Sequence, residues 1–88
     1  MSLQNLNLNL LRVFGSVYRT RSMTEAALEL HLTQSGISQH VKSLEDFMEL
    51  KLFDRMKQKI VPTEKAHVLY AEWASAIEKI ESGVIRVK

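Results

Sequence analysis

Residues 26–44 read AALELHLTQSGISQHVKSL, and the pattern within them decides the fold of the chain. Ala26 and Ala27 are small enough to let two helices cross closely at a steep angle. Leu30 and Leu32 can fill the space inside a tight turn that follows the first of these helices. The second helix has an apolar inward face at four- and three-residue spacing, formed by Ile37, Val41 and Leu44. The stretch therefore predicts two helices joined by a tight turn, a helix-turn-helix.

The second helix of this pair is predicted over about residues 34–47, with Thr33 as its N-cap. Its outward face carries amide and hydroxyl groups and almost no net charge. The side chains on this face are Gln34, Ser35, Ser38, Gln39 and Lys42, with His40 at the margin. Amides and hydroxyls pair well with base edges in the major groove of DNA. Taken alone, however, these residues favour a plain solvated face over a base-reading one.

A helix precedes this pair, and a small hairpin follows it. Apolar residues recur every three or four positions from Leu8 to Arg19, which predicts a helix there. Ser22 and Glu25 form a capping box at the start of the next helix, in which each side chain would bond the other residue's backbone amide. Two short apolar pieces flank the charged stretch 54–59, and they predict a two-stranded hairpin over about residues 53–61.

A long helix is predicted from Thr63 to the end of the chain. Its apolar residues recur at spacings of 3, 4, 4, 3, 4 and 3, and they are Ala66, Leu69, Trp73, Ile77, Ile80, Val84 and Val87. About 25 helical residues span ~37 Å, which is more than a domain of this size can cover. We therefore expect two copies to pair through this helix. The residues expected in that contact are Leu69, Trp73, Ile77, Ile80 and Val84.

Composition and charge narrow the classes of function. The 88 residues form one small domain at most, and the absence of cysteine excludes disulfides and thiolate metal sites. The net charge is only +2, yet residues 1–21 hold three arginines and no acid. Residues 51–67 hold five lysines and arginines against two acids. Such clusters favour a nucleic-acid partner only if they share one face of the folded molecule.

Catalysis, metal binding and membrane insertion find no support in the sequence. It contains no glycine-rich phosphate loop and no nucleophile paired with a base, and its three histidines lack metal-ligand spacing. The carboxylates of Glu45, Asp46 and Glu49 fall at helical spacing, and we expect them on an outward face. No apolar run approaches the ~18 residues of a membrane helix, and the N-terminus lacks the features of a secretion signal. We expect a cytoplasmic protein that is not an enzyme and has no cofactor.

Several linked motifs resemble the LysR-type transcriptional regulators. Residues 26–45 carry the run A-A-x-x-L-x-L-T-Q-S-x-I-S-x-x-V-x-x-L-E, residues 52–55 read L-F-x-R, and residues 63–66 read T-E-x-A. The resemblance implies a mainly α fold, with three helices and a two-stranded wing forming a winged helix-turn-helix over residues 1–62. A linker helix over residues 63–88 would pair two copies. In that family a larger ligand-sensing domain normally follows. It is absent from this sequence, so an effector is expected only if such a domain exists.

The resemblance also implies roles for individual residues. The residues expected to face base edges in the major groove are Gln34, Ser35, Ser38 and Gln39. The residues expected at the DNA backbone are Thr33, His40, Lys42, Arg55, Lys57 and Lys59. The wing residues among them could also enter the minor groove. The chain would then be a dimeric bacterial transcription regulator that reads a pseudo-palindromic operator in double-stranded DNA, with half-sites about 34 Å apart or a multiple of it. The alternative is a winged-helix protein-interaction module without specific DNA binding.

Several positions depart from the family pattern. The family usually has proline in place of Ser35, and arginine is common in place of Gln39. It often has glycine shortly before the L-F pair, where this chain has Met48-Glu49-Leu50-Lys51. A wing arginine is also common, where this chain offers Lys57 and Lys59. These changes bear on base preference and on the wing's minor-groove role, and they do not threaten the fold.

Overall fold

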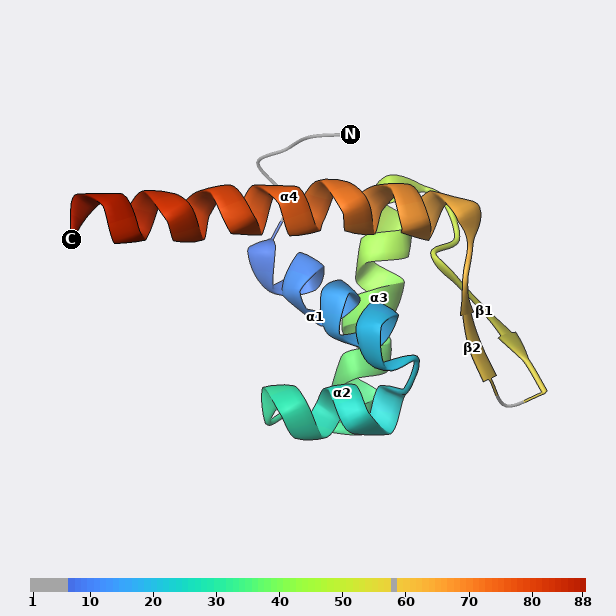
Figure 1. Ribbon diagram of the computed structural model, residues 1–88. Helices are drawn as coiled ribbons and strands as arrows, with labels where there is room; N and C mark the ends of the chain where they lie inside the picture. Colours follow the sequence, from blue (N-terminus) through green and yellow to red (C-terminus); the bar gives the residue numbers. More distant parts are fainter. Residues whose placement is uncertain (1–6, 58) are drawn as a thin grey trace.

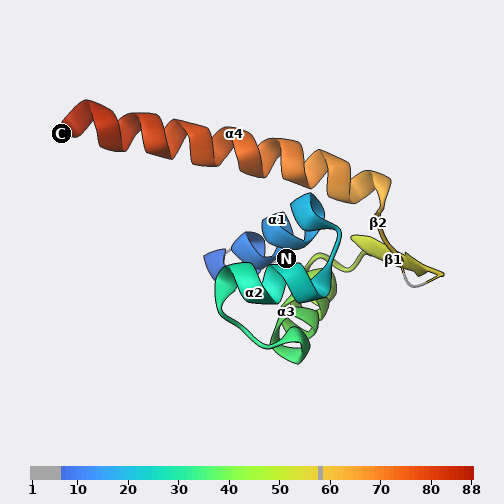
Figure 2. The same ribbon diagram turned by 60° about the horizontal axis from the view of Figure 1, so that its bottom comes forward.

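Three helices, a hairpin and a long final helix make up the computed structural model, which describes residues 7–57 and 59–88 (Figure 1). In chain order the elements are α1 (Leu8–Thr20), α2 (Met23–Leu30), α3 (Gln34–Met48), β1 (Phe53–Met56), β2 (Lys59–Pro62) and α4 (Glu64–Val87). α1, α2 and α3 pack against one another, α4 crosses over α1, and the hairpin stands beside them as a wing (Figure 2). The mainly helical fold predicted from the sequence is confirmed.

Each helix begins at a polar side chain that accepts a hydrogen bond from the backbone of its first turn. These N-caps are Asn7, Ser22, Thr33 and Thr63. The predicted bond from the Glu25 amide to the Ser22 hydroxyl is present at 3.1 Å. The reciprocal half of the predicted capping box is replaced, because the Ser22 amide donates to Oγ1 of Thr20 at 3.3 Å. The loop between α1 and α2 therefore satisfies its own backbone groups.

Three helices end in the left-handed conformation without a glycine. Arg21, His31 and Glu49 have φ angles of 55°, 58° and 58°. At the ends of α2 and α3, the next backbone amide reaches back across the final turn to a carbonyl at 2.9 and 3.2 Å, which is the Schellman arrangement. A residue with a Cβ is disfavoured in this conformation by roughly 1–2 kcal/mol. These helix ends are therefore held by their hydrogen bonds and packing, against local preference.

The core lies where α1, α3 and the start of the wing meet. Its largest fully buried side chains are Phe14, Ile37, Leu44, Leu52 and Val17. The ring of Phe14 lies 5.6 Å from that of Phe53, so α1 and β1 share this core. Leu30 is half-buried at the end of α2, but Leu32 is 41% exposed. The prediction that both leucines fill the turn is therefore wrong for Leu32, since the turn carries it toward solvent.

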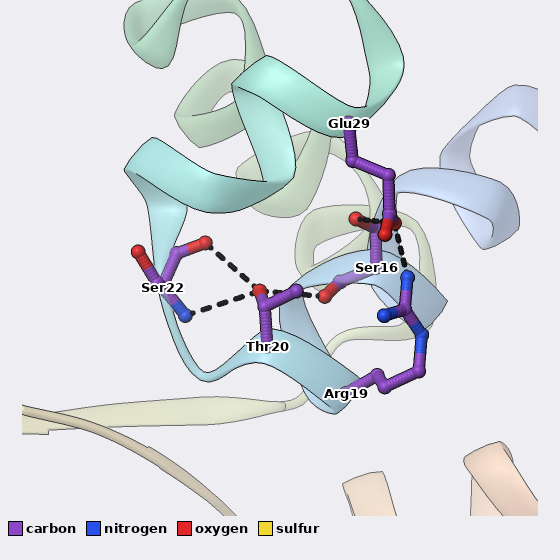
Figure 3. A network of polar contacts seen from close by, with 5 residues as sticks. All are labelled: Ser16, Arg19, Thr20, Ser22 and Glu29. Carbon is purple, nitrogen blue, oxygen red and sulfur yellow. Dashed lines mark hydrogen bonds and ion pairs between the residues drawn. The ribbon is translucent and has the colours of Figure 1, made fainter.

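Polar contacts join α1 to α2 beside the core (Figure 3). The hydroxyl of the buried Ser16 donates to Oε2 of Glu29 at 2.6 Å, and Arg19 forms an ion pair with the same oxygen. The hydrogen bond from Arg19 contributes most to lowering the pKa of Glu29, and the bond from Ser16 adds to it. Oγ1 of Thr20 donates to the Ser16 carbonyl at 2.8 Å. The two helices are thus held at a fixed crossing by side chains as well as by apolar packing.

Hydrogen bonds tie the wing to α3 and close the base of the hairpin. β1 and β2 pair antiparallel, with Phe53 opposite Pro62. Oε2 of Glu45, from α3, accepts hydrogen bonds from the amides of Leu52 at 2.7 Å and Phe53 at 3.2 Å. At the other end the Thr63 amide donates to the Leu52 carbonyl at 2.9 Å. Glu45 was expected on an outward face, but it is half-buried, because the chain returns across α3 immediately after the helix ends.

The first half of α4 lies against α1. Tyr70 stacks on Tyr18 with ring centroids 4.0 Å apart, and the Tyr18 hydroxyl is 2.7 Å from Nδ1 of His67. Trp73 lies against Gly15, where an added Cβ would come 2.8 Å from the indole Nε1. The lack of a side chain at Gly15 therefore lets α4 approach α1 closely. We call these α1–α4 contacts, made by Gly15, Tyr18, His67, Tyr70 and Trp73, the linker seam.

Candidate nucleic-acid interface

The first half of α3 presents a neutral, hydrogen-bonding face to solvent. Gln34, Ser35 and Gln39 are exposed, and Ser38 is half-buried. The opposite side of the helix is buried in the core, as the apolar spacing predicted. The four side chains predicted to face base edges therefore share one accessible surface, and their donors and acceptors are of the kinds that bases require.

A shallow groove joins this face to the wing. It has a volume of about 410 Å³ and is lined by Gln34, Ser35, Ser38 and Gln39 of α3, Met23 of α2 and Arg55 of β1. Arg55 is exposed, and its guanidinium can form paired hydrogen bonds with a phosphate or with a guanine edge. The fold thereby brings one predicted backbone contact beside all four predicted base contacts.

The other predicted backbone cations lie outside this groove. Lys42 lies about one turn further along α3, and it lines an adjoining groove together with Arg55. Lys57 and Lys59 are exposed at the outer end of the hairpin, away from the three-helix body (Figure 1). These two lysines therefore lie apart from the α3 face.

His40 lies apart from the other predicted contacts. Its Nδ1 is 2.6 Å from the Gly36 carbonyl, and its ring is half-buried. It lines a small hollow of about 130 Å³ with residues that include Arg12 of α1 and Leu32. The structure thus places His40 on the flank of α3 that faces α1, where Nε2 is the nitrogen left to meet a phosphate.

Charge is distributed unevenly along α3. Its first turn carries no acidic residue, whereas the first turns of α2 and α4 carry Glu25 and Glu64. The positive end of the α3 dipole therefore has no carboxylate beside it in that turn, and it can favour a phosphate. Asp46 and Glu49 are exposed near the other end of the helix, where they would repel one. The first half of α3 is the half that suits a polyanion.

The roles of two residues near this surface were not predicted from the sequence. Thr24, in the first turn of α2, accepts a hydrogen bond from Nε2 of Gln34 at 2.8 Å. Glu45 anchors the wing through the amides described above. Nothing in the spacing of Thr24 and Gln34 indicates their contact, since it depends on how α2 and α3 cross. Glu45 ends the long motif shared with the LysR type, but the motif does not name its partner.

The residues predicted for dimerisation fall into two groups. Leu69 packs against the core of its own chain, while Trp73 and Ile77 line a groove between α1 and α4. Ile80 and Val84 are 61% and 49% exposed, on the part of α4 that extends past the body (Figure 1). The second group is therefore the part of the predicted dimer surface that its own chain leaves uncovered.

No competing kind of site is found in the part of the chain that the structure describes. Residues 7–57 and 59–88 contain no group of three or more histidine or acidic side chains that could hold a metal ion. No helix among them is long and apolar enough to cross a membrane. The α3 face with the wing is therefore the candidate functional surface.

Comparison with known families agrees with this geometry. Residues 8–67 match the family described as bacterial regulatory helix-turn-helix protein, lysR family. The matched span includes α1, the helix-turn-helix, the wing and the first residues of α4. It identifies a family of transcription regulators and not of enzymes, in agreement with the prediction from the sequence.

Curated relatives are similar to this chain over part of their length. The glycine cleavage system transcriptional activator of Escherichia coli (strain K12) is 45% identical over 65 residues, which are 74% of this chain and 21% of that protein. The HTH-type transcriptional activator AmpR of Citrobacter koseri is 41% identical over 78 residues, which are 89% of this chain and 27% of that protein. The chain thus spans roughly a quarter of the length of these relatives.

Solved structures share the arrangement of the elements. The probable transcriptional regulator PA0477 from Pseudomonas aeruginosa superposes with a TM-score of 0.85 at 34% identity, over 98% of this chain and 29% of that one. The BenM DBD, solved in a complex with catB site 1 DNA, gives a TM-score of 0.79 at 26% identity, over 93% of this chain and 96% of that one. With the family match, these likenesses show that the chain belongs to the LysR family of bacterial regulatory helix-turn-helix proteins and forms its DNA-binding domain.

Proposed function

We propose that this chain binds double-stranded DNA sequence-specifically as a homodimer and thereby regulates transcription. The first half of α3 would enter the major groove, and the wing would lie on the backbone or in the minor groove. The observation that carries the proposal is the single groove in which Gln34, Ser35, Ser38 and Gln39 meet Arg55. Base-reading groups and a phosphate-binding cation are thereby presented on one surface.

The residues of this surface differ in chemistry, and we assign their roles accordingly. Glutamine amides and serine hydroxyls can distinguish bases by their donor and acceptor patterns. Arg55, Lys42, Lys57 and Lys59 would bind phosphates and fix the register, while Thr33 would hold the start of α3 against the backbone. The likeness to the BenM DBD, which was solved with bound DNA, supports this orientation.

The exposed end of α4 supports the homodimer. Ile80 and Val84 continue the apolar stripe of α4 beyond the body, at the spacing of paired helices. A second copy of the same helix would cover them, and the resulting two-fold symmetry would present two α3 helices to one duplex. We therefore propose a pseudo-palindromic operator with half-sites about 34 Å, or a multiple of it, apart.

The proposal is tested by selecting bound sequences from a random duplex pool at two salt concentrations. We expect enrichment of a two-fold symmetric site that persists at the higher salt. Weak binding without enrichment, abolished by salt, would contradict the proposal and would favour a protein-interaction module that uses α4 as its docking surface.

The wing has a separate test. Lys57→Ala should weaken binding to all duplexes alike and reduce the slope of log affinity against log salt by about one. Lys79→Ala, on the exposed side of α4, is the matched control and should leave the slope unchanged. An unchanged slope for Lys57→Ala would remove the tip of the wing from the interface.

A further inference from the structure

The Gln34 amide, proposed above to read a base, is held by a residue outside α3. Its Nε2 donates to Oγ1 of Thr24 at 2.8 Å. Gln34 is the first residue of α3, and Thr24 lies in the first turn of α2. The hydrogen bond therefore joins the N-terminal ends of the two helices of the helix-turn-helix. Both side chains are exposed, so the bond lies on the surface that would face DNA.

This bond decides which groups of the amide remain for a base. A glutamine side chain has one oxygen acceptor and two N–H donors. With one N–H given to Thr24, Oε1 and the second N–H remain. An acceptor next to a donor is complementary to N6 and N7 of adenine in the major groove. The other three bases show different patterns there, so Oε1 and the second N–H can distinguish adenine from them.

Without the bond, the amide would lose its fixed orientation. The terminal torsion of glutamine is broad, with two nearly equivalent orientations that exchange the oxygen and the nitrogen. A free amide could therefore offer either group to a given base atom, and it would lose rotamer freedom on binding. The neighbouring start of α3 is already ordered, because Oγ1 of Thr33 accepts from the Gly36 amide at 3.0 Å. Thr24, from α2, fixes the Gln34 side chain in addition.

We infer that Thr24 is a positioning residue that fixes the Gln34 amide for recognition of adenine at one position of each half-site. The inference rests on the proposed function and deepens it, because it names the base and the residue that sets the preference. Thr24 itself touches no base in this account. Its effect is on specificity, and it should not alter the phosphate contacts that provide most of the affinity for random DNA.

The experiment compares four forms of the 88-residue chain in the same random-pool selection: wild type, Thr24→Val, Thr24→Ser and Gln34→Ala. Valine keeps the branched shape and removes the acceptor, while serine keeps the hydroxyl. We expect wild type and Thr24→Ser to prefer adenine at one position of each half-site. Thr24→Val should lose roughly 2- to 10-fold of that preference, the value of one net hydrogen bond. Gln34→Ala should lose the preference altogether.

A second measurement asks whether the adenine edge is the target. The selected adenine is replaced by 7-deazaadenine, which lacks the N7 acceptor. Wild type and Thr24→Ser should lose affinity for the modified duplex, and Thr24→Val should lose clearly less. Affinity for random DNA and its salt slope should be equal in wild type, Thr24→Ser and Thr24→Val. If valine lowers the melting temperature, Thr24→Ala, which suits a helix better, takes its place.

The outcomes separate the two proposals. Unchanged adenine preference in a folded Thr24→Val, or a preference for another base at the Gln34 position of the wild type, would overturn the positioning role while sequence-specific binding stands. No enriched site for the wild type would overturn the proposed function itself. Equal losses on selected and random DNA would show that Thr24 acts on phosphate binding and would also contradict the inference.

Discussion

At the scale of single residues, the contact between Glu29, Arg19 and Ser16 makes the α1–α2 packing depend on pH. The hydrogen bonds from Arg19 and Ser16, with the charge of Arg19, lower the pKa of Glu29 below its ordinary value of 4.5. A carboxylate with a lowered pKa stabilises the folded state above that ordinary value, and its contribution is lost as pH falls through the lowered one. Glu29→Gln should therefore lower the melting temperature most near neutral pH and least below about pH 4.

Melting curves followed by circular dichroism between pH 7 and pH 3 check this expectation. Glu72→Gln is the matched control, because it removes the same charge from an exposed position of α4 outside the Glu29 network. A difference between wild type and Glu29→Gln that stays constant across the whole range would show that the ion pair does not contribute to the pH dependence.

The left-handed end of α3 provides a second prediction at the residue scale. Glu49, the residue that follows α3, has a φ of 58°. Glu49→Gly should stabilise the fold by roughly 0.5–1 kcal/mol, since relief of the strained conformation exceeds the extra entropy of glycine in the unfolded chain. Glu49→Ala removes the same carboxylate but keeps the Cβ, so chemical denaturation should rank glycine above alanine. The reverse order would contradict the assigned backbone conformation.

At the scale of elements, the wing depends on one side chain of α3. Glu45→Ala removes the acceptor of two backbone amides, those of Leu52 and Phe53, and should cost roughly 1–3 kcal/mol. Hydrogen exchange at these two amides should also become faster. Glu45→Gln retains an acceptor and should lose less, and Asp46→Ala, exposed on the same helix, should change little. Equal stability of the alanine and glutamine variants would contradict the anchoring role.

Comparing the sequence-based predictions with the structure shows how much of the elements could be predicted. Helix positions, caps and inward faces follow from neighbours three or four residues apart, and Thr33 and Ser22 cap the helices as predicted. The roles of Glu45 and Thr24 depend on segments that come together only after the helices cross. The helical spacing of α3 predicted that Glu45 faces outward. That spacing carries no information about the chain that folds back over Glu45 after the helix ends.

At the scale of the whole molecule, the linker seam sets the direction in which α4 leaves the winged helix. In the proposed dimer that direction fixes the distance between the two α3 helices. A tilt of about 5° displaces the far end of a ~36 Å helix by about 3 Å, close to one base-pair step. Gly15→Ala would place a Cβ 2.8 Å from Nε1 of Trp73, so the indole must shift, and we expect α4 to move with it.

We expect Gly15→Ala to change the preferred spacing of the half-sites while leaving the affinity for an isolated half-site unchanged. Binding to a series of duplexes with spacers altered by one or two base pairs measures this preference. Gly83→Ala is the control, because an added Cβ there meets no atom within 4 Å. Identical spacing preferences of Gly15→Ala and wild type would show that the seam absorbs the extra methyl group without moving α4.

The linker seam also contains the single tryptophan of the chain, Trp73, which is half-buried against α1. Indole fluorescence responds to water and to nearby polar groups. The tryptophan emission of this chain therefore reports on the linker seam, where α4 packs against α1. A shift in that emission upon addition of duplex, or upon dilution of the proposed dimer, would report movement of α4 without an attached dye. Trp73 is therefore an intrinsic optical reporter of the position of α4.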